Sequence, residues 1–272
     1  MRIAVTGGSG RIGRALRAEF AGRFERLRVV DKIRPADLRA GEDYAEADLA
    51  DPAAACEALK GVDGIVHLAG NAGNGGNASF ADVLPANIVT TWNVYDAARA
   101  NGVARVVFGG SNHALGFLPR GLKADERAPL RPDSPYGLSK AFGELVASLY
   151  WDKFGVRSLV MRIGNAAALP PDVRSLSMWV SARDLAQLTL IGLEHRGITC
   201  DIVYGVSDNS LSFYDNARAH ALGYRPRDRA DDHRAGALEG EKTRTASEVT
   251  RNFQGGGFAD KDYVYPLRAP RP

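Results

Sequence analysis

The chain has few cysteines, no long apolar run and no block of like charge, and each absence excludes a class of protein. Its two cysteines, Cys56 and Cys200, give neither a disulfide framework nor the spacing of a metal site, so we expect buried thiols in a reducing cytoplasm and no metal. No apolar stretch approaches the roughly 18 residues that span a membrane, and the chain starts with a strand pattern rather than a signal peptide. The net charge of +3 is scattered along the chain, so no nucleic-acid partner is expected.

The 272 residues have a composition typical of a soluble enzyme, with 45% hydrophobic and 25% charged residues. A chain of this length buries a substantial core as one domain, or as one domain with a small annex. Short apolar strands alternate with helical patterns as far as residue 163, without an internal repeat or a linker. This alternation predicts an α/β fold, a Rossmann doubly wound parallel sheet with right-handed crossovers. The expected strands are residues 2–5, 27–30, 44–47, 64–70, 103–111 and 158–163, and the expected helices are residues 14–20, 53–59, 80–101 and 136–154.

A glycine-rich turn lies between the first expected strand and the first expected helix. In residues 6–13, Gly7, Gly10 and Gly13 permit a tight turn, close approach of the backbone to a pyrophosphate, and close packing of helix on strand. The N-terminus of the following helix supplies N–H donors to the phosphates. Strand, glycine turn and helix in this order predict a dinucleotide site.

The second expected strand ends in Asp31, 18 residues after Gly13. This is close to the spacing of about 20 residues at which an acid binds the adenosine ribose hydroxyls. Because a carboxylate there repels a 2′-phosphate, we expect NAD rather than NADP. Lys32 and Arg34 follow closely, and such basic side chains could tolerate a phosphate. A second interpretation is that Asp31 only caps a loop.

Tyr136 and Lys140 are four positions apart at the start of a long expected helix, so they lie on one face of it. An ordinary tyrosine has a pKa near ~10, and a nearby ammonium lowers it, which makes a phenolate that can take a proton from an alcohol. Ser111 ends a buried strand, at the carboxyl edge where open α/β sheets bind ligands, and its hydroxyl can hold the substrate oxygen. Taken alone, each motif fits a solvated helix face or a turn cap. Together with the glycine turn, they predict a dehydrogenase with Ser111, Tyr136 and Lys140 as catalytic residues.

These motifs resemble the extended short-chain dehydrogenase/reductase superfamily over residues 1 to about 165. The resemblance is carried by the glycine turn, Asp31, Asp48-Leu49, residues 67–69, Ser111 and the Tyr136/Lys140 pair. A narrower resemblance is to the bacterial uronate dehydrogenases, and it is carried by residues 111–117, 136–144, 150–155, 162–164 and 253–258. That family oxidises glucuronate or galacturonate at the anomeric carbon to an aldarolactone with NAD. The Ser111-Asn112-His113 run is the most specific part of the match.

The resemblance implies roles for further residues. Contacts with NAD are implied for Gly7, Gly10, Arg11, Ile12, Gly13, Asp31, Asp48, Leu49, Leu68, Ala69, Gly70, Asn87, Tyr136, Lys140 and Ile163. Contacts with the substrate are implied for Ser111, Asn112, His113, Tyr136, Asn165, Arg174 and Phe258.

Arg174 occupies the position that clamps the substrate carboxylate in the uronate dehydrogenases. A guanidinium suits bidentate recognition of a carboxylate. The alternative is a surface arginine, or one paired with Asp172. By the same resemblance Asn112 and His113 bond sugar hydroxyls, and their alternative is a polar turn after a strand.

The chain departs from the uronate dehydrogenases at two places. Asn165 stands where the family usually has a serine near the carboxylate end of the substrate. Residues 71–77 are richer in Gly and Asn than expected where the family places a substrate-contacting serine. These changes leave the redox chemistry intact and keep a dehydrogenase of a neutral aldose open.

We therefore expect residues 1–165 to form an NAD-binding core, and residues 166–272 to form a small C-terminal substrate-binding annex that completes the same domain. The expected partner is a small-molecule sugar acid, bound by a cytoplasmic homo-oligomer. A nucleotide-sugar epimerase or dehydratase of the same superfamily stays open, although only 132 residues follow Lys140 to make room for a nucleotide diphosphate. An NAD-sensing regulator also stays open, but it has no need of the Tyr136/Lys140 pair.

Overall fold

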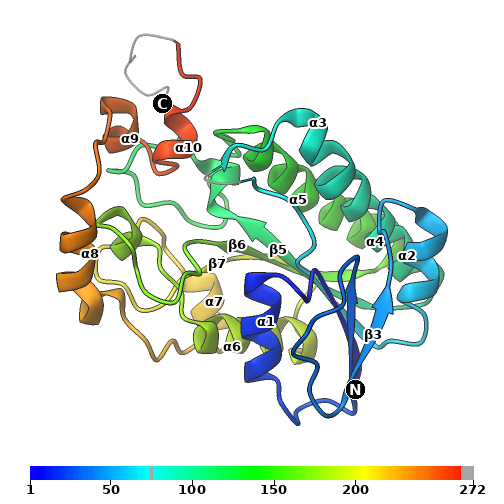
Figure 1. Cartoon of the computed structure of the whole chain (residues 1–272). Helices are drawn as coiled ribbons and strands as arrows, with labels where there is room; N and C mark the ends of the chain where they lie inside the picture. The colour runs from blue at the N-terminus through cyan, green and yellow to red at the C-terminus, as the bar shows by residue number, and fades with distance from the viewer. Residues whose placement is uncertain (74–75, 265–272) are drawn as a thin grey trace.

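A seven-stranded parallel sheet forms the centre of the structure, a computed structural model that describes residues 1–73 and 76–264. The strand order is β3-β2-β1-β4-β5-β6-β7 (Figure 1). The strands are β1 (Arg2–Thr6), β2 (Arg26–Asp31), β3 (Glu42–Glu46), β4 (Gly64–His67), β5 (Arg105–Ser111), β6 (Arg157–Ile163) and β7 (Cys200–Gly205). The direction of the order reverses at β1, which pairs with β2 on one side and β4 on the other. Open α/β sheets bind ligands at such a switch point, and the predicted fold class is confirmed.

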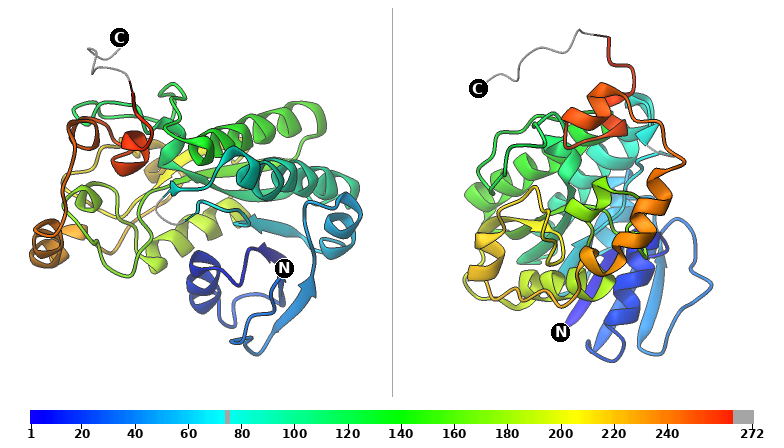
Figure 2. Two further views of the ribbon diagram at one scale, coloured as in Figure 1. Left: turned by 45° about the horizontal axis from the view of Figure 1, so that its top comes forward. Right: turned by 90° about the vertical axis from the view of Figure 1, so that its left-hand side faces the viewer.

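Helices cover both faces of the sheet: α1 and α6 lie on one face, and α2, α4 and α5 on the other (Figures 1 and 2). The α-helices are α1 (Arg11–Glu19), α2 (Pro52–Ala58), α3 (Phe80–Val83), α4 (Thr90–Ala100), α5 (Pro135–Phe154), α6 (Ala182–Glu194), α7 (Ala217–Ala221), α8 (Arg234–Glu241), α9 (Glu248–Asn252) and α10 (Gly257–Asp260). Shorter helical turns are η2 (Leu84–Val89), η3 (Asn112–Leu115), η4 (Arg174–Ser177) and η5 (Ala230–His233). None of the helices in the described residues is long and apolar enough to cross a membrane.

The strands are apolar because both faces of the sheet are buried. Ile3 and Val5 belong to the apolar cluster that includes side chains of α1 and α6, while Ala4 between them belongs to the cluster of α2, α4 and α5. This alternation follows the two-residue period of a strand. Each fully buried Val, Leu or Ile contributes about 1.5–3 kcal/mol, so the two clusters hold the carboxyl ends of the strands in fixed positions.

The sheet extends beyond the boundary expected at residue 165. Helix α6 and strand β7 come from the part of the chain whose pattern is less regular, yet β7 pairs with β6 over Ser158–Ile163. The segments after β7 turn back to the start of the long helix: α10 lies next to the beginning of α5, and α9 packs against α10 (Figure 1). The C-terminal part therefore completes both the sheet and its carboxyl edge.

The single helix expected over residues 80–101 is interrupted. Helix α3 ends at Val83, the π-helical turn η2 follows, and α4 begins at Thr90. Pro85, near the start of η2, has no N–H to donate, and its carbonyl accepts a 3.0 Å hydrogen bond from the Thr90 hydroxyl. π-Helical turns often occur at functional sites, and this one carries Asn87.

Candidate active site

Ser111, Tyr136 and Lys140 meet at the carboxyl edge of the sheet, where the sequence predicts them. Ser111 is the last residue of β5. Helix α5 starts just before Tyr136 because the Ser134 hydroxyl caps it, accepting a 3.0 Å hydrogen bond from Gly137 N. Lys140 lies one turn further along, with Nζ 5.6 Å from the centre of the Tyr136 ring. The three side chains line one cavity.

Burial dominates the electrostatics of Tyr136. It raises the pKa of the phenol, and the opposing effect of a hydrogen bond with Ser111 is smaller. Lys140 Nζ donates a 2.8 Å hydrogen bond to Gly109 O, and burial lowers the pKa of Lys140 to about 8. The expectation that Lys140 lowers the pKa of Tyr136 is therefore not met in this geometry, because the ammonium is directed at a carbonyl and desolvation of the phenol outweighs the other effects.

The glycine turn has the shape that a pyrophosphate requires. Gly7 has a φ of +67°, and a Cβ atom on it would lie 2.7 Å from Ala69 N. A Cβ atom on Gly13 would lie 2.5 Å from Gly7 O, so only glycine fits either position. At Gly10, which precedes α1, a Cβ atom would come within 4 Å of Gly7 O, at 3.2 Å, and of no other atom counted among the described residues. The turn is thus tight on its inner side and open on the side of the helix N-terminus, as dinucleotide phosphates need.

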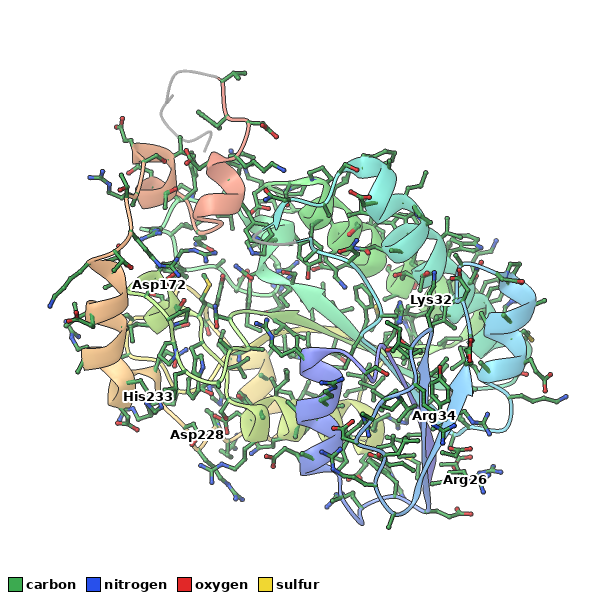
Figure 3. All side chains as sticks on the ribbon, viewed as in Figure 1. Arg26, Lys32, Arg34, Asp172, Asp228 and His233 are labelled. Carbon is green, nitrogen blue, oxygen red and sulfur yellow. The ribbon has the colours of Figure 1, made fainter. Side chains whose placement is uncertain are left out.

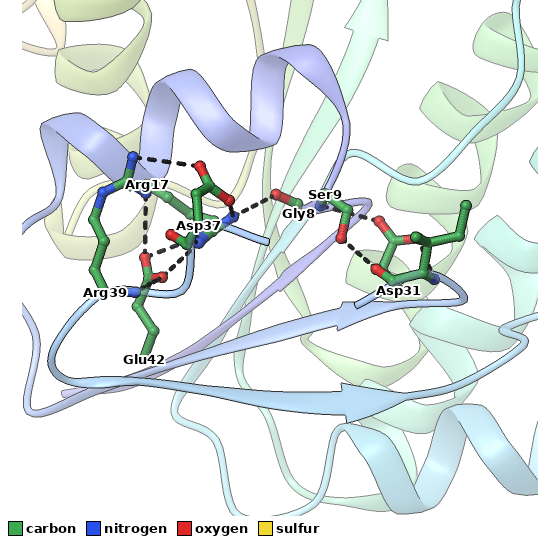
Figure 4. Close-up of polar contacts among 8 residues, drawn as sticks. Gly8, Ser9, Arg17, Asp31, Asp37, Arg39 and Glu42 are labelled. Carbon is green, nitrogen blue, oxygen red and sulfur yellow. Dashed lines mark hydrogen bonds and ion pairs between the residues drawn. The ribbon is translucent and has the colours of Figure 1, made fainter. Parts of the chain in front are cut away.

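Asp31 and Lys32 favour NAD over NADP. The Asp31 carboxylate accepts hydrogen bonds from the backbone N–H of Ser9 at 3.0 Å and of Ile33 at 3.3 Å (Figure 4). Lys32 Nζ lies 2.7 Å from an Asp48 carboxylate oxygen. Lys32 is therefore directed at Asp48, which leaves the carboxylate of Asp31 as the charge at the end of β2.

Behind the glycine turn, Arg17 ties α1 to the loop that follows β2 (Figure 4). Its side chain has no exposed surface, and it donates hydrogen bonds to Glu42 (2.5 and 3.1 Å), Asp37 (3.2 Å) and Gly8 O (3.1 Å). Burial lowers the pKa of Arg17, but Glu42 and Asp37 together raise it more, so the pKa lies above its usual value. This network holds the turn against the strand that carries Asp31.

Asn87 reaches the site from η2. Its Oδ1 accepts a 2.7 Å hydrogen bond from Asn71 N, and its Nδ2 donates to Ser139 Oγ at 2.8 Å. A Cβ atom on Gly70 would lie 3.3 Å from Asn87 Oδ1 and 3.5 Å from Lys140 Nζ. The segment after β4 is thus in contact with both the π-helical turn and helix α5. The residues expected to contact NAD that do not line the cavity described next are Gly7, Gly10, Gly13, Asp31, Asp48, Leu49, Ala69, Gly70 and Asn87.

A cavity of about 260 Å³ opens beside Ser111, Tyr136 and Lys140. It is lined by all seven residues expected to bind substrate: Ser111, Asn112, His113, Tyr136, Asn165, Arg174 and Phe258. Arg11, Ile12, Leu68 and Ile163, which are expected to contact NAD, line it as well. The cavity therefore joins the predicted cofactor side to the predicted substrate side.

Arg174 has no acidic partner among the described residues. Its Nε donates a 2.8 Å hydrogen bond to Gln254 O, while its Nη2 is buried and unpartnered. Asp172, the alternative partner, lies beside α8 (Figure 3), 2.7 Å from Arg244 Nη1, and accepts a hydrogen bond from Ser175 N. Burial lowers the pKa of Arg174, although an arginine stays charged at any ordinary pH. The interpretation that Arg174 pairs with Asp172 is therefore wrong.

His113 and Phe258 form one wall of the cavity. Their rings stack with centres 3.8 Å apart and planes inclined by 21°. Phe258 also fills the space above Gly76, where a Cβ atom would lie 2.5 Å from its ring. Of the Gly/Asn-rich loop 71–77, residues 74 and 75 lie outside the described residues, and Ala72 lines the cavity.

Asn165, one of the two places at which the chain departs from the uronate dehydrogenases, lines the cavity. Asn165 Oδ1 accepts a 3.0 Å hydrogen bond from Ala167 N, which leaves the Nδ2 group as its free donor in the described residues. Asn112 Nδ2 lies 3.8 Å from Met178 Sδ. Both amides can thus still donate to a ligand.

Sequence reasoning missed three polar residues around the cavity. Asp133 binds His113, and Tyr214 and Gln254 each have a buried oxygen that lacks a hydrogen-bond partner among the described residues. Asp133 precedes the helix cap Ser134, which is a weak signal because acids are common there. Tyr214 and Gln254 come from distant segments, and nothing in their local sequence indicates a site.

The chain can now be compared with known proteins. Residues 3–183 match the NAD dependent epimerase/dehydratase family. The chain belongs to this family. Among its relatives in the family, the uronate dehydrogenase of Pseudomonas putida is 41% identical and covers 95% of each chain. The uronate dehydrogenase of Agrobacterium fabrum is 37% identical over 95% of this chain and 97% of its own.

The solved structures agree. A mutant uronate dehydrogenase from Agrobacterium tumefaciens, complexed with NAD, superposes with a TM-score of 0.89 at 36% identity, covering 96% of this chain and 97% of its own. As a member of the epimerase/dehydratase family with such relatives, the protein is an NAD-dependent dehydrogenase.

Proposed function

We propose that this dehydrogenase oxidises a hexuronic acid, glucuronate or galacturonate, at C1 to the aldarolactone. The observation that carries the proposal is Arg174, whose buried Nη2 has no partner among the described residues and whose side chain lines the same cavity as Ser111 and Tyr136. A uronate has a carboxylate at one end and its anomeric hydroxyl at the other. A guanidinium and a proton acceptor at separate points of one cavity match both ends.

Bound NAD supplies the hydride acceptor and the positive charge of its oxidised ring. The residues of the chain position the alcohol and move its proton. Ser111 orients the C1 hydroxyl, and Tyr136, as the phenolate, accepts its proton. Because burial raises the pKa of Tyr136, the phenolate depends on positive charge brought into the site beyond Lys140. Arg174 fixes the carboxylate and with it the face of C1 that is presented for oxidation.

The cofactor-binding part of the proposal follows the edge of the sheet. The turn from Gly7 to Gly13 holds the pyrophosphate, and Asp31 binds the adenosine ribose. Asp48 and Leu49 border the adenine, and Lys140 binds the nicotinamide ribose. The fit rests on the turn, which no residue with a Cβ atom could form at Gly7 or Gly13.

The test is NAD reduction with glucuronate and galacturonate, and with glucose and galactose as the matching neutral sugars. We expect NADH to form with the uronates at rates at least about 100-fold higher in kcat/KM, because only they engage Arg174. Equal activity on the neutral sugars would overturn the assignment of the substrate. Tyr136→Phe should abolish turnover and leave NAD binding intact, and substantial residual turnover would sink the assignment of the base.

A neutral aldose is the second candidate, and Asn165 favours it. Asn165 lines the cavity at a position where the uronate dehydrogenases usually have a serine, so this part of the pocket is reshaped. A nucleotide-sugar epimerase is less suited, since only 132 residues follow Lys140 to make room for a nucleotide diphosphate. Net formation of NADH from a free sugar separates both dehydrogenases from the epimerase.

We also infer a homo-oligomer, as expected from the sequence. Trp92 on α4 and Leu145 and Leu149 on α5 are exposed by 44%, 61% and 38%, which gives these adjacent helices an apolar outer face. Light scattering on the purified protein measures the assembly, and a monomer at micromolar concentration would contradict the inference. The cytoplasmic location stays a prediction.

A further inference from the structure

A buried carboxylate stands directly behind the substrate side of the cavity. The side chain of Asp133 has no exposed surface. Its Oδ2 lies 2.7 Å from His113 Nδ1, and its Oδ1 accepts a 2.8 Å hydrogen bond from Ser134 Oγ. No lysine or arginine of the described residues forms an ion pair with it. The histidine ring and one hydroxyl are therefore its polar contacts.

Three glycines from separate segments make room for this carboxylate. A Cβ atom on Gly116 or Gly255 would overlap Asp133 Oδ2, and one on Gly137 would lie 3.0 Å from Oδ1. Gly116 follows η3, Gly137 is in α5, and Gly255 precedes α10. Because these three segments all lack a side chain next to Asp133, the fold accommodates an acid at this position.

The ring of His113 is held on its other sides as well. Phe258 stacks on one face at 3.8 Å, and Tyr136 contacts it edge-on with ring centres 6.0 Å apart. The two ring nitrogens of an imidazole point in different directions, so with Nδ1 on Asp133, Nε2 points away from it. His113 lines the cavity, and no hydrogen bond to Nε2 comes from the described residues.

A carboxylate at Nδ1 keeps the proton on that nitrogen, and in the neutral ring Nε2 is then an acceptor. We propose that Asp133 is a positioning residue that fixes this tautomer, so that His113 Nε2 accepts a hydrogen bond from one sugar hydroxyl and selects its configuration. Without the carboxylate, Nε2 can present either an N–H donor or a lone pair. A sugar hydroxyl both donates and accepts, so it can bond to either form. The role in selecting sugars rests on the proposed function, whereas the tautomer does not.

Nitrogen NMR of the histidine side chains at alkaline pH tests the tautomer without turnover. The chain has five histidines, and the His113 signals are assigned by their loss in His113→Ala. We expect the proton on Nδ1 in the native protein, and a shift towards Nε2 in Asp133→Ala. An Nε2–H tautomer in the native protein would overturn the proposal. An Nδ1–H tautomer in a protein that does not oxidise uronates would sink the proposed function alone.

Steady-state kinetics test the consequence for the substrate. We expect Asp133→Ala to raise KM for the preferred uronate about 10-fold, to change kcat by less than about 3-fold, and to leave KM for NAD unchanged. In the His113→Ala background the same substitution should have no further effect, because Asp133 acts through His113. Additive losses in the double variant would overturn the proposal.

A matched control separates this effect from the loss of any buried carboxylate. Asp184 in α6 is fully buried, does not line the cavity, and accepts a 2.6 Å hydrogen bond from Ser207 Oγ. Asp184→Ala should lower the melting temperature and leave KM for the uronate unchanged. If Asp133→Ala does not fold, Asp133→Asn replaces it in the cycle, and the NMR of the native protein still decides the tautomer.

Discussion

Two buried guanidinium groups in opposite halves of the molecule have opposite surroundings. Arg17, behind the glycine turn, bonds Glu42 and Asp37, and these acids raise its pKa in spite of burial. Arg174, in the substrate cavity, has a carbonyl as its hydrogen-bond partner among the described residues, and burial lowers its pKa. The charge of a paired cation is compensated within the fold, so losing either partner destabilises the protein, whereas an unpaired cation is free to bind a ligand's charge.

Lys140 belongs with Arg174 in this comparison. It is buried, its ammonium is held by Gly109 O, and no acid of the described residues pairs with it. Lys140 and Arg174 are thus two buried cations beside one cavity that have no counter-ion among the described residues, at a cost in stability. Around β1–β3, the buried Arg17 is paired with acids, and the exposed Lys32 is paired with Asp48.

The largest expected effect is on stability, from Arg17→Met. The substitution leaves Glu42, whose side chain is 5% exposed, as a buried charge without its main partner. We expect the free energy of unfolding to fall by about 3–5 kcal/mol, measured by urea denaturation. Arg174→Met is the matched variant in the other half, and an equal loss of stability in both would break the comparison.

Arg174→Met should instead act on catalysis. It removes the cation that we propose binds the substrate carboxylate, so we expect kcat/KM for uronates to fall about 100-fold, or about 2.7 kcal/mol, at an unchanged KM for NAD. Stability should change by less than about 1 kcal/mol, because no acid loses its partner. A fall of the same size on neutral sugars would show that Arg174 supports the cavity rather than the carboxylate.

Lys140→Met should stabilise the protein near neutral pH. Burial lowers the pKa of Lys140 from 10.5 to about 8, so between these values the unfolded chain binds more protons and the native protein gains stability as the pH rises. Below pH 8 the native protein carries the full cost of the buried ammonium. We expect the variant to be about 1–3 kcal/mol more stable at pH 7, with an advantage that shrinks towards pH 10.5.

Thermal unfolding of both proteins at pH 7 and pH 10 measures the difference. The variant is expected to be inactive, which makes it a direct case of stability gained where function is lost. If the native protein is more stable than the variant at pH 7, the stabilisation from the hydrogen bond between Lys140 and Gly109 O exceeds the desolvation cost of the ammonium.

The smallest effect is expected at Lys32. Its ion pair with Asp48 is exposed, so Lys32→Ala should change the free energy of unfolding by less than about 1 kcal/mol and KM for NAD by less than about 3-fold. Asp31→Ala is the contrasting variant, because it removes the carboxylate that repels a 2′-phosphate. Of the two variants, we expect only Asp31→Ala to raise the ratio of NADP to NAD activity. A comparable rise in Lys32→Ala would contradict the pairing of Lys32 with Asp48.

Features that depend on neighbouring residues were predictable from the sequence. The glycine turn, the strand ending in Ser111 and the helix bearing Tyr136 and Lys140 each follow from local backbone chemistry, and all three stand where they were expected. The seventh strand was not predicted, because Cys200–Gly205 mixes polar and apolar residues. The interruption at Pro85 had a visible signal, the proline itself, which the helical pattern around it outweighed.

Features that depend on tertiary contacts were not predictable. The sequence does not show that Asp172 binds Arg244, and therefore not that Arg174 is left unpaired. Nor does it show that desolvation raises the pKa of Tyr136, since burial comes from elements distant in the chain. Asp133 was not predicted for the same reason, because its environment depends on Gly255, which is more than a hundred residues away in the chain.

The segment that follows the sheet has a consequence for the order of events during protein synthesis. Gln254 O holds Arg174, Phe258 covers His113, and Arg120 binds the carbonyls of Thr250 and Phe253. The ribosome releases these residues about fifty positions after the last strand. The nascent chain can therefore assemble its proton-transfer groups before the contacts that hold Arg174 and His113 exist. The contacts that we propose for a sugar acid therefore form only in a chain that has been translated past residue 258.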